Sequence, residues 1–240
     1  MTNINVDSEI ILYDLPTKGT PTAWSLNTWK TRLALNFKGI EYKTEWVEYP
    51  DIAPVLKSLN TTPNANPKLP PYTVPAVRFP NGETILDSLI IAAKLEELFS
   101  TPSLYLDAPV IPDIQAAVGR SFNRLFTIVS PAKLLNEPSA IYFAAKDARD
   151  VAKFGPDHEG ETAWEMATGE LQNLAKLIKG PFVLGEEVSY ADFVVVGFLR
   201  HAWRAAGIEV LEKVLRTDES GKLRGVYEGV EKKGLLERSD

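Results

Sequence analysis

The N-terminal part of the chain alternates short apolar runs with amphipathic stretches, a pattern typical of a domain that mixes strands and helices. Residues Ile10–Tyr13 form an apolar run that predicts a buried strand. Within Ser25–Lys38, apolar residues recur at the i, i+3 and i+4 positions of an amphipathic helix, and Gly39 is well placed to end it. Glu41–Val47 alternates and predicts a second strand, and Ile52–Leu59 predicts a short helix.

A hairpin and another helix follow. Strands are predicted over Val74–Phe79 and Glu83–Leu86, because the turn between them contains Asn-Gly, a strong hairpin signal. Ser88–Phe99 has the periodicity of a helix. The resulting order, βαβαββα, is that of a thioredoxin-like fold, in which a mixed four-stranded sheet carries helices on both faces.

The pattern changes after a proline-containing stretch, Ser100–Pro112, which predicts a linker. Everything beyond it has helical periodicity. Helices are expected over Ile114–Ile128, Ser139–Phe154, Glu161–Leu177 and Tyr190–Ala206, with weaker segments to about Leu236. We therefore expect an α/β thioredoxin-like domain over residues 1–102, followed by an all-helical domain over residues 112–240.

Composition and charge narrow the classes of function. The net charge is −6 and no cluster of Lys and Arg supplies a basic stripe, so no nucleic acid is expected as a partner. No apolar run is long enough to span a membrane and no signal peptide is recognisable, which predicts a cytoplasmic protein. The chain has no cysteine, which excludes disulfides, thiolate metal sites and a cysteine nucleophile. With only His158 and His201 as histidines, no metal is expected, and any thiol must come from a ligand.

Two short motifs predict a site for a small peptide. If the Val74–Pro75 bond is cis, the main chain of Val74 turns outward and offers its N–H and C=O to an extended ligand; the alternative is an ordinary edge-strand proline. Asp87-Ser88 lies where a strand meets a helix, a place at which a serine is usually an N-cap. The same helix start and the Ser88 hydroxyl can donate to a carboxylate, while Asp87 can pair with an α-ammonium. The γ-glutamyl end of glutathione presents both groups.

The sequence resembles the glutathione S-transferases over nearly its whole length. The segments WSLNTWKTRLALNFKGIEY, YTVPAV, LDSLIIAAKLEE and GEEVSYADFVV follow in the order and spacing of that family. Ser25–Gly39 is similar to the serine-type fungal classes related to bacterial β-etherases, in which a serine stands four residues before a Trp-Lys/Arg-x-Arg/Lys pattern. Here the serine is Ser25, before Trp29-Lys30-Thr31-Arg32, and Leu26 stands where those classes usually have proline.

The resemblance implies that Ser25 activates the thiol of glutathione. A free thiol has a pKa of ~8.5, so a hydroxyl that donates to the sulfur near a helix N-terminus favours the thiolate and improves the nucleophile. The alternatives are that Ser25 is a plain N-cap, or that Asn27 or Tyr13 contacts the sulfur. Lys68 is expected to reach the glycine carboxylate of glutathione, or else to be a solvated loop lysine.

The second substrate is expected between the domains, above the sulfur. Trp24, Phe122 and Phe126 are candidate walls of this acceptor site, although each can equally belong to the core. The segment around Ser189 and Asp192 predicts a capping box, which is structural rather than catalytic. We expect His201 to be a packing or partly exposed residue and not a catalytic one.

These observations predict an enzyme that uses glutathione as co-substrate against apolar, aromatic electrophiles, by conjugation, peroxide reduction or β-aryl ether cleavage. The cysteine-type members of the family are excluded because the chain has no cysteine. A non-catalytic protein that binds small aromatic compounds such as phenolics is the alternative. A pure interaction module is a third reading, and the retained motifs argue against it. The family resemblance implies a homodimer.

Overall fold

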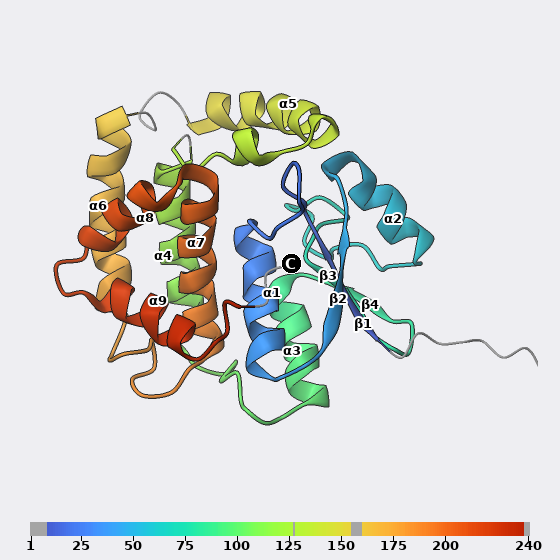
Figure 1. Cartoon of the computed structure of the whole chain (residues 1–240), viewed down its shortest axis with the longest axis horizontal. Coiled ribbons are helices and arrows are strands. Elements are labelled where there is room, and N and C mark those ends of the chain that lie inside the picture. The colour runs from blue at the N-terminus through green and yellow to red at the C-terminus, as the bar shows by residue number, and fades with distance from the viewer. Residues whose placement is uncertain (1–8, 127, 155–159, 238–240) are drawn as a thin grey trace, which may run out of the picture.

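The computed structural model describes residues 9–126, 128–154 and 160–237, with the main chain alone for residues 146–154. His158 lies outside the described residues. Figure 1 shows an N-terminal sheet with its helices beside a group of C-terminal helices. Helices α1 and α3 lie between the sheet and the C-terminal helices, and α2 covers the opposite face of the sheet (Figure 1).

The N-terminal part has the predicted thioredoxin-like order. Its strands are β1 (Ile10–Asp14), β2 (Tyr42–Trp46), β3 (Ala76–Arg78) and β4 (Thr84–Leu86). They form a sheet in the order β2-β1-β3-β4, with β2 parallel to β1 and the other two pairs antiparallel. The helices are α1 (Leu26–Phe37), α2 (Ile52–Ser58, preceded by the 3₁₀ helix η1, Tyr49–Asp51) and α3 (Ser88–Leu98). The prediction of a mixed sheet with helices on both faces is confirmed.

The C-terminal part is all-helical, as predicted. Its elements are α4 (Ile111–Arg124), the 3₁₀ helix η2 (Pro131–Leu134), α5 (Glu137–Phe154), α6 (Gly160–Lys176), α7 (Tyr190–Ala206), α8 (Ile208–Arg216) and α9 (Lys222–Lys232). Helix α4 begins three residues before the predicted Ile114, inside the expected linker. Pro112 sits in its first turn, where a missing N–H costs nothing, so the proline starts this helix instead of preventing it.

Helix α7 is the centre of the molecule and packs against α1, α4, α8 and α9. Residues Tyr190–Ala202 are all buried. The predicted capping box is present: Asp192 Oδ2 accepts from the N–H and the hydroxyl of Ser189, both at 2.8 Å. Gly197 faces α1, where a Cβ would lie 2.8 Å from the main-chain oxygen of Leu26. The two domains therefore meet by direct backbone approach beside the start of α1.

A buried ion pair anchors α1 to the sheet. Arg32 Nε donates to Asp14 Oδ2 at 2.8 Å, and both side chains are fully buried. A second nitrogen of the same guanidinium donates to Thr44 Oγ1 at 3.0 Å, so the helix is tied to β1 and β2 together. Removing one member of a fully buried pair costs about 3–5 kcal/mol, because the other charge is left without a partner. This pair fixes where the first turn of α1 lies relative to the ends of the strands.

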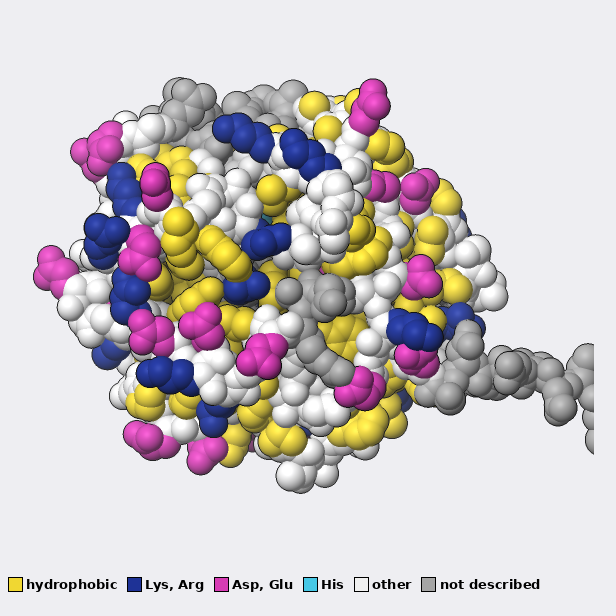
Figure 2. All heavy atoms as spheres, in the orientation of Figure 1, with side chains coloured by type: hydrophobic (Ala, Val, Ile, Leu, Met, Phe, Trp, Pro, Cys, Tyr) yellow, Lys and Arg dark blue, Asp and Glu magenta, His cyan; other side chains and the backbone are white. Residues whose placement is uncertain are grey.

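Two features of the described residues bear on partners. None of the described helices has the length and apolar character needed to cross a lipid bilayer. On the face shown in Figure 2, Lys and Arg side chains are interspersed with Asp and Glu instead of forming a continuous stripe.

Candidate functional site

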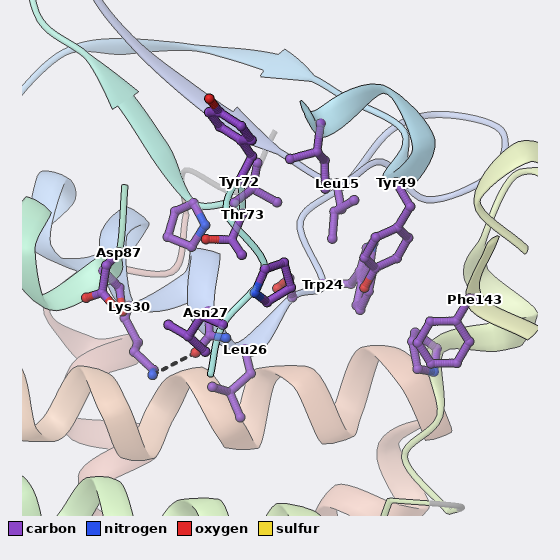
Figure 3. Close-up of a pocket in the computed structure, with 18 of the residues that line it drawn as sticks. Leu15, Trp24, Leu26, Asn27, Lys30, Tyr49, Tyr72, Thr73, Asp87 and Phe143 are labelled. Atoms are coloured by element: carbon purple, nitrogen blue, oxygen red, sulfur yellow. Dashed lines mark hydrogen bonds between the residues drawn. The ribbon is translucent and has the colours of Figure 1, made fainter. Parts of the chain in front are cut away.

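A cavity of about 870 Å³ lies where the two domains meet. Its walls come from the loop before α1, from η1 and α2, from the loop before β3, from the start of α3, and from α4, α5 and α7. In Figure 3, Trp24, Tyr49 and Phe143 lie toward one end, and Asn27, Lys30 and Asp87 lie toward the other. The cavity thus has an aromatic end and a polar end.

The fold brings nearly all of the predicted site residues to this cavity. Those that line it are Trp24, Ser25, Val74, Pro75, Asp87, Ser88, Phe122 and Phe126. Lys68 does not line it: the residue is exposed in the loop before β3, next to Leu69, which does. Lys57, which no sequence motif singled out, is a cavity-lining lysine whose ammonium lies 5.6 Å from the centre of the Tyr72 ring.

Ser25 occupies the N-cap position of α1 but does not cap with its side chain. Its carbonyl oxygen accepts from the Trp29 N–H at 3.0 Å and from the Thr28 hydroxyl at 3.1 Å. The Ser25 hydroxyl makes no hydrogen bond within the described part of the chain and lines the cavity. It is therefore available to a ligand.

The two alternatives to Ser25 are placed differently. Tyr13 is a buried residue of β1 and is not among the cavity-lining residues. Burial raises the pKa of its hydroxyl, which interacts with Arg78. Asn27 does line the cavity, but its Oδ1 accepts from the ammonium of Lys30 at 2.8 Å.

The Val74–Pro75 bond is cis, which is the condition that the sequence-based hypothesis set. The preceding loop is held in shape by Asn64, whose side chain donates to the oxygen of Pro70 at 2.7 Å and to Thr73 Oγ1 at 3.0 Å. Among the described residues, neither the N–H nor the C=O of Val74 makes a hydrogen bond. Both groups belong to a residue that lines the cavity.

Asp87, not Ser88, caps α3. Its Oδ1 accepts from the N–H of Leu89 at 2.8 Å and from that of Ile90 at 3.3 Å. Asp87 has φ of 71°, a conformation that costs a non-glycine residue about 1–3 kcal/mol and that often occurs at ligand sites. Ser88 is the first residue of the helix, and its Oγ accepts from the Tyr190 hydroxyl at 3.2 Å. The N–H groups of Leu89 and Ile90, which were expected to be free for a ligand at the start of this helix, are thus already bound to Asp87.

Sequence reasoning missed Lys30, although a signal was present. It lies four residues after Leu26 and three before Leu33, on the apolar face of the helix, where a lysine is rare. The side chain is only 9% exposed and lines the polar end of the cavity. Burial lowers the pKa of its ammonium to about 8, an effect that the nearby Asp87 carboxylate opposes.

The aromatic end contains three rings that the sequence did not single out. Tyr49 from η1 stacks on Tyr142 from α5, with 5.6 Å between ring centres and 8° between planes, and Phe143 lies 6.1 Å from Tyr49. Trp24 lies 6.4 Å from Tyr49, so the rings continue toward Ser25. Tyr142 and Phe143 belong to an alanine-rich helix of the other domain, and no local signal relates them to the site.

His201 of α7 also lines the cavity, beside the rings of Trp24 and Phe122. It is buried, with Nδ1 3.2 Å from the Trp24 oxygen and Nε2 2.9 Å from the Val129 oxygen. Its ring lies 5.8 Å from that of Trp24 and 5.3 Å from that of Phe122. Burial lowers the pKa of this imidazole to about 4, a shift that its contacts with the two carbonyl oxygens oppose. As expected from the sequence, it is a packing residue.

No three Asp, Glu or His side chains within the described ranges come together in a way that could hold a metal ion. The site is organic in character: it combines free main-chain donors and acceptors with the Asp87 carboxylate, the ammonium groups of Lys30 and Lys57, the free hydroxyl of Ser25 and a set of aromatic rings. These groups suit a zwitterionic peptide beside an apolar compound.

Comparison with known proteins agrees with this geometry. Residues 24–98 match the N-terminal domain and residues 114–230 the C-terminal domain of glutathione S-transferase. Glutathione S-transferase CsGST63524 of Ceriporiopsis subvermispora, solved in complex with glutathione, is 33% identical, with a TM-score of 0.76 over 93% of this chain and 97% of that one. Glutathione transferase GSTFuA3 of Phanerochaete chrysosporium is 28% identical, with a TM-score of 0.79 over 93% and 96%.

A curated protein with a related sequence is the glutathione S-transferase-like protein ustS of Aspergillus flavus. It is 29% identical over 213 residues, which cover 78% of this chain and 76% of that protein. The match of both domains, together with the 33% identity over nearly the full length of a solved relative, shows the family. This chain belongs to the glutathione S-transferase family.

Proposed function

We propose that this chain is a serine-type glutathione transferase that activates the thiol of glutathione for attack on apolar, aromatic electrophiles. The observation that carries the proposal is the free hydroxyl of Ser25, a residue that lines the cavity and stands in the sequence between Trp24 of its aromatic end and Asn27 of its polar end. A relative of 33% identity was crystallised with glutathione, which supports the choice of co-substrate.

Glutathione would bind along the polar end. The unpaired N–H and C=O of Val74 suit the main chain of its cysteinyl residue. Asp87 and Ser88 would hold the γ-glutamyl end, Asp87 at the α-ammonium and Ser88 through its hydroxyl. Lys68 remains our candidate for the glycine carboxylate, and Lys57, which lines the cavity, is a second one.

In this arrangement Ser25 Oγ donates a hydrogen bond to the sulfur and favours loss of the thiol proton to solvent. In conjugation by substitution and in ether cleavage, the thiolate donates an electron pair to carbon, and the halide or aryloxide departs with the electrons of the broken bond. In addition to an isothiocyanate, the electrons of the C=N bond move to nitrogen, which takes a proton from solvent. In peroxide reduction, the thiolate attacks a peroxide oxygen and releases an alcohol, and a second glutathione thiol and a proton convert the resulting sulfenate to the disulfide with release of water. The reaction class, whether conjugation, peroxide reduction or β-aryl ether cleavage, depends on the acceptor. Trp24, Phe122 and Phe126, with Tyr49, Tyr142 and Phe143, would form the acceptor site for it.

The proposal assigns glutathione to residues 1–102 and the larger part of the acceptor site to residues 112–240. Membership of the etherase-related class rests on the resemblance of Ser25–Gly39 to the fungal classes, and a homodimer rests on the resemblance to the family as a whole. A cytoplasmic location stays a prediction from the sequence.

A binding protein without turnover is the second candidate, and the aromatic end of the cavity favours it. Glu48 accepts hydrogen bonds from Asn136, at 2.7 Å, and from Ser139, so η1 is tied to the start of α5 across the domain boundary. This tie keeps Tyr49 and Tyr142 stacked, a geometry that suits a bound planar ring.

The test is glutathione-dependent turnover of an aryl halide, an isothiocyanate and a β-aryl ether by wild type, Ser25→Ala and Asn27→Ala. Loss of one positioned donor to a developing charge typically lowers kcat by about 100-fold, so Ser25→Ala should do so while its Kd for glutathione changes little. Asn27→Ala, which removes the rival donor, should retain most of the wild-type kcat at saturating glutathione. Full activity of Ser25→Ala would remove that hydroxyl from the reaction. Tight glutathione binding by a wild type that turns over none of the three electrophiles would favour the binding protein.

A further inference from the structure

Within the described residues, the ammonium of Lys30 is a buried charge in the cavity wall that has no ion-pair partner. An ammonium has three N–H donors, and the hydrogen bond found for this one among the described residues goes to Asn27 Oδ1, a neutral acceptor, at 2.8 Å. Lys30 is only 9% exposed, so water can supply few of the hydrogen bonds that the other two N–H groups lack. Buried charges are normally paired, since leaving one without a counter-ion costs several kcal/mol.

The stem of Lys30 fixes where this charge lies. It runs from α1 past Gly197 of α7, where a Cβ would come within 3.5 Å of Lys30 Cγ. Asn27, one turn earlier on α1, then holds the ammonium at the polar end of the cavity, near Asp87 (Figure 3). Although burial lowers its pKa to about 8, most of the group is still protonated at pH 7.

The cavity therefore offers one cation and one anion near each other. The Asp87 carboxylate uses Oδ1 to cap α3, and within the described residues no hydrogen bond reaches its Oδ2. The capping also removes the N–H groups of Leu89 and Ile90 as donors to a ligand. A negative group that binds next to Asp87 therefore keeps the Ser88 hydroxyl as a neutral donor, and Lys30 adds a charged donor beside it.

We propose that Lys30 binds the α-carboxylate of the γ-glutamyl end of glutathione, opposite the α-ammonium held by Asp87. This inference rests on the proposed glutathione site and adds a residue to it. A zwitterionic amino acid head carries one charge of each sign, and the pair Lys30 and Asp87 is complementary to it. Asn27 acts as a positioning residue that orients the ammonium and not as a donor to the sulfur.

The experiment uses a ligand pair that differs only in the group in question. S-Methylglutathione has no thiol, so its binding reports on contacts other than the activation of sulfur. Its analogue with 4-aminobutyrate in place of the γ-glutamyl residue keeps the ammonium and lacks the α-carboxylate. Isothermal titration calorimetry at pH 7 gives the Kd of each for wild type, Lys30→Gln, Lys30→Arg and Lys38→Gln. Thermal unfolding verifies that each variant is folded.

Wild type should bind S-methylglutathione about 10- to 100-fold more tightly than the analogue, as expected for a charge-assisted hydrogen bond in a desolvated site. Lys30→Gln should lose most of this difference, the remainder being the contribution of the Ser88 hydroxyl, and Lys30→Arg should recover part of what is lost. Lys38→Gln is the matched control: the side chain of Lys38, at the C-cap of the same helix, is also buried, but its ammonium pairs with Glu96 at 2.7 Å, away from the cavity. It should keep the wild-type ratio.

A wild type that does not bind S-methylglutathione overturns the glutathione site and this inference with it. A wild type that binds both ligands equally well overturns the carboxylate contact alone. If Lys30→Gln weakens both ligands by the same factor, Lys30 has only a structural role and the inference is wrong. A Lys30→Gln variant that keeps the wild-type ratio but loses turnover would assign the ammonium to the sulfur or to the second substrate, which also overturns it.

Discussion

The hydroxyl of Tyr190 donates a hydrogen bond of 3.2 Å to Oγ of Ser88. Tyr190 begins α7 in the helical domain and is completely buried, whereas Ser88 begins α3 in the other domain and lines the cavity. Because Ser88 Oγ accepts this bond, its own proton is free to point at a ligand. A residue outside the cavity thus sets the donor direction of a residue inside it.

Replacing Tyr190 with Phe should weaken glutathione binding by about 2- to 10-fold, the range expected from one neutral hydrogen bond. The aromatic ring remains, so the fold should lose only about 1 kcal/mol of stability. Calorimetric titration with glutathione, together with urea unfolding, measures both effects. An unchanged Kd beside reduced stability would mean that the bond serves the domain contact and not the ligand.

Replacing Tyr142 with Ala should raise the KM for 1-chloro-2,4-dinitrobenzene by about 2- to 10-fold, because a stacked ring contributes about 0.5–1.5 kcal/mol beyond its buried area. Tyr142 is 44% exposed, so the variant should stay folded. The Kd for glutathione should not change, since the polar end keeps all its groups. Ile141→Ala is the control: Ile141 is 67% exposed and does not line the cavity. Equal effects of both variants would argue against a specific aromatic wall.

Gly197→Ala should lower the free energy of unfolding by about 1–3 kcal/mol, the usual cost of overpacking a tight contact. The new Cβ would meet the Leu26 oxygen at 2.8 Å, a main-chain atom that can move only if α1 moves. Since Leu26 follows Ser25, we also expect kcat to fall. Gly169→Ala on α6 is the control, because it makes the same change within a helix but its Cβ would meet no atom within 4 Å. It should raise the free energy of unfolding by about 0.5–1 kcal/mol. Urea unfolding of both variants tests this; equal effects would contradict it.

His201 predicts a loss of stability at acid pH. Its pKa is about 4 in the folded protein, below its ordinary value of 6.5, so its contribution is complete above pH 6.5. As the pH falls from 6.5 to 4, His201 binds a proton in the unfolded chain but not in the folded one. The free energy of unfolding therefore falls by about 3 kcal/mol. His201→Gln should lose correspondingly less stability between pH 7 and 4. Urea unfolding at several pH values in this range measures the free energy of unfolding of both proteins. If the two free energies fall in parallel with pH, His201 does not titrate as expected.

Much of the fold was predictable because its signals are local. Apolar periodicity predicted α1 and β1, and an Asn-Gly turn predicted the β3–β4 hairpin. The capping box at Ser189 and Asp192 depends on residues three apart, so it too could be predicted from the sequence. Where these predictions missed, as at the early start of α4, a proline tolerated in the first turn was the reason.

The sequence by itself determined which chemical groups were available: no cysteine, a serine at a helix start, a Val-Pro strand entry and an Asp-Ser helix entry. Only the tertiary structure decided which other groups join them. Tyr142 and Phe143 come from α5, and Lys30 meets Asp87 only because α1 packs against α3. That Asp87 and not Ser88 caps α3 likewise depends on the positive φ of Asp87 and on the hydrogen bond that Tyr190 of α7 donates to Ser88. Such contacts depend on how elements pack against each other, for which a linear pattern carries no signal.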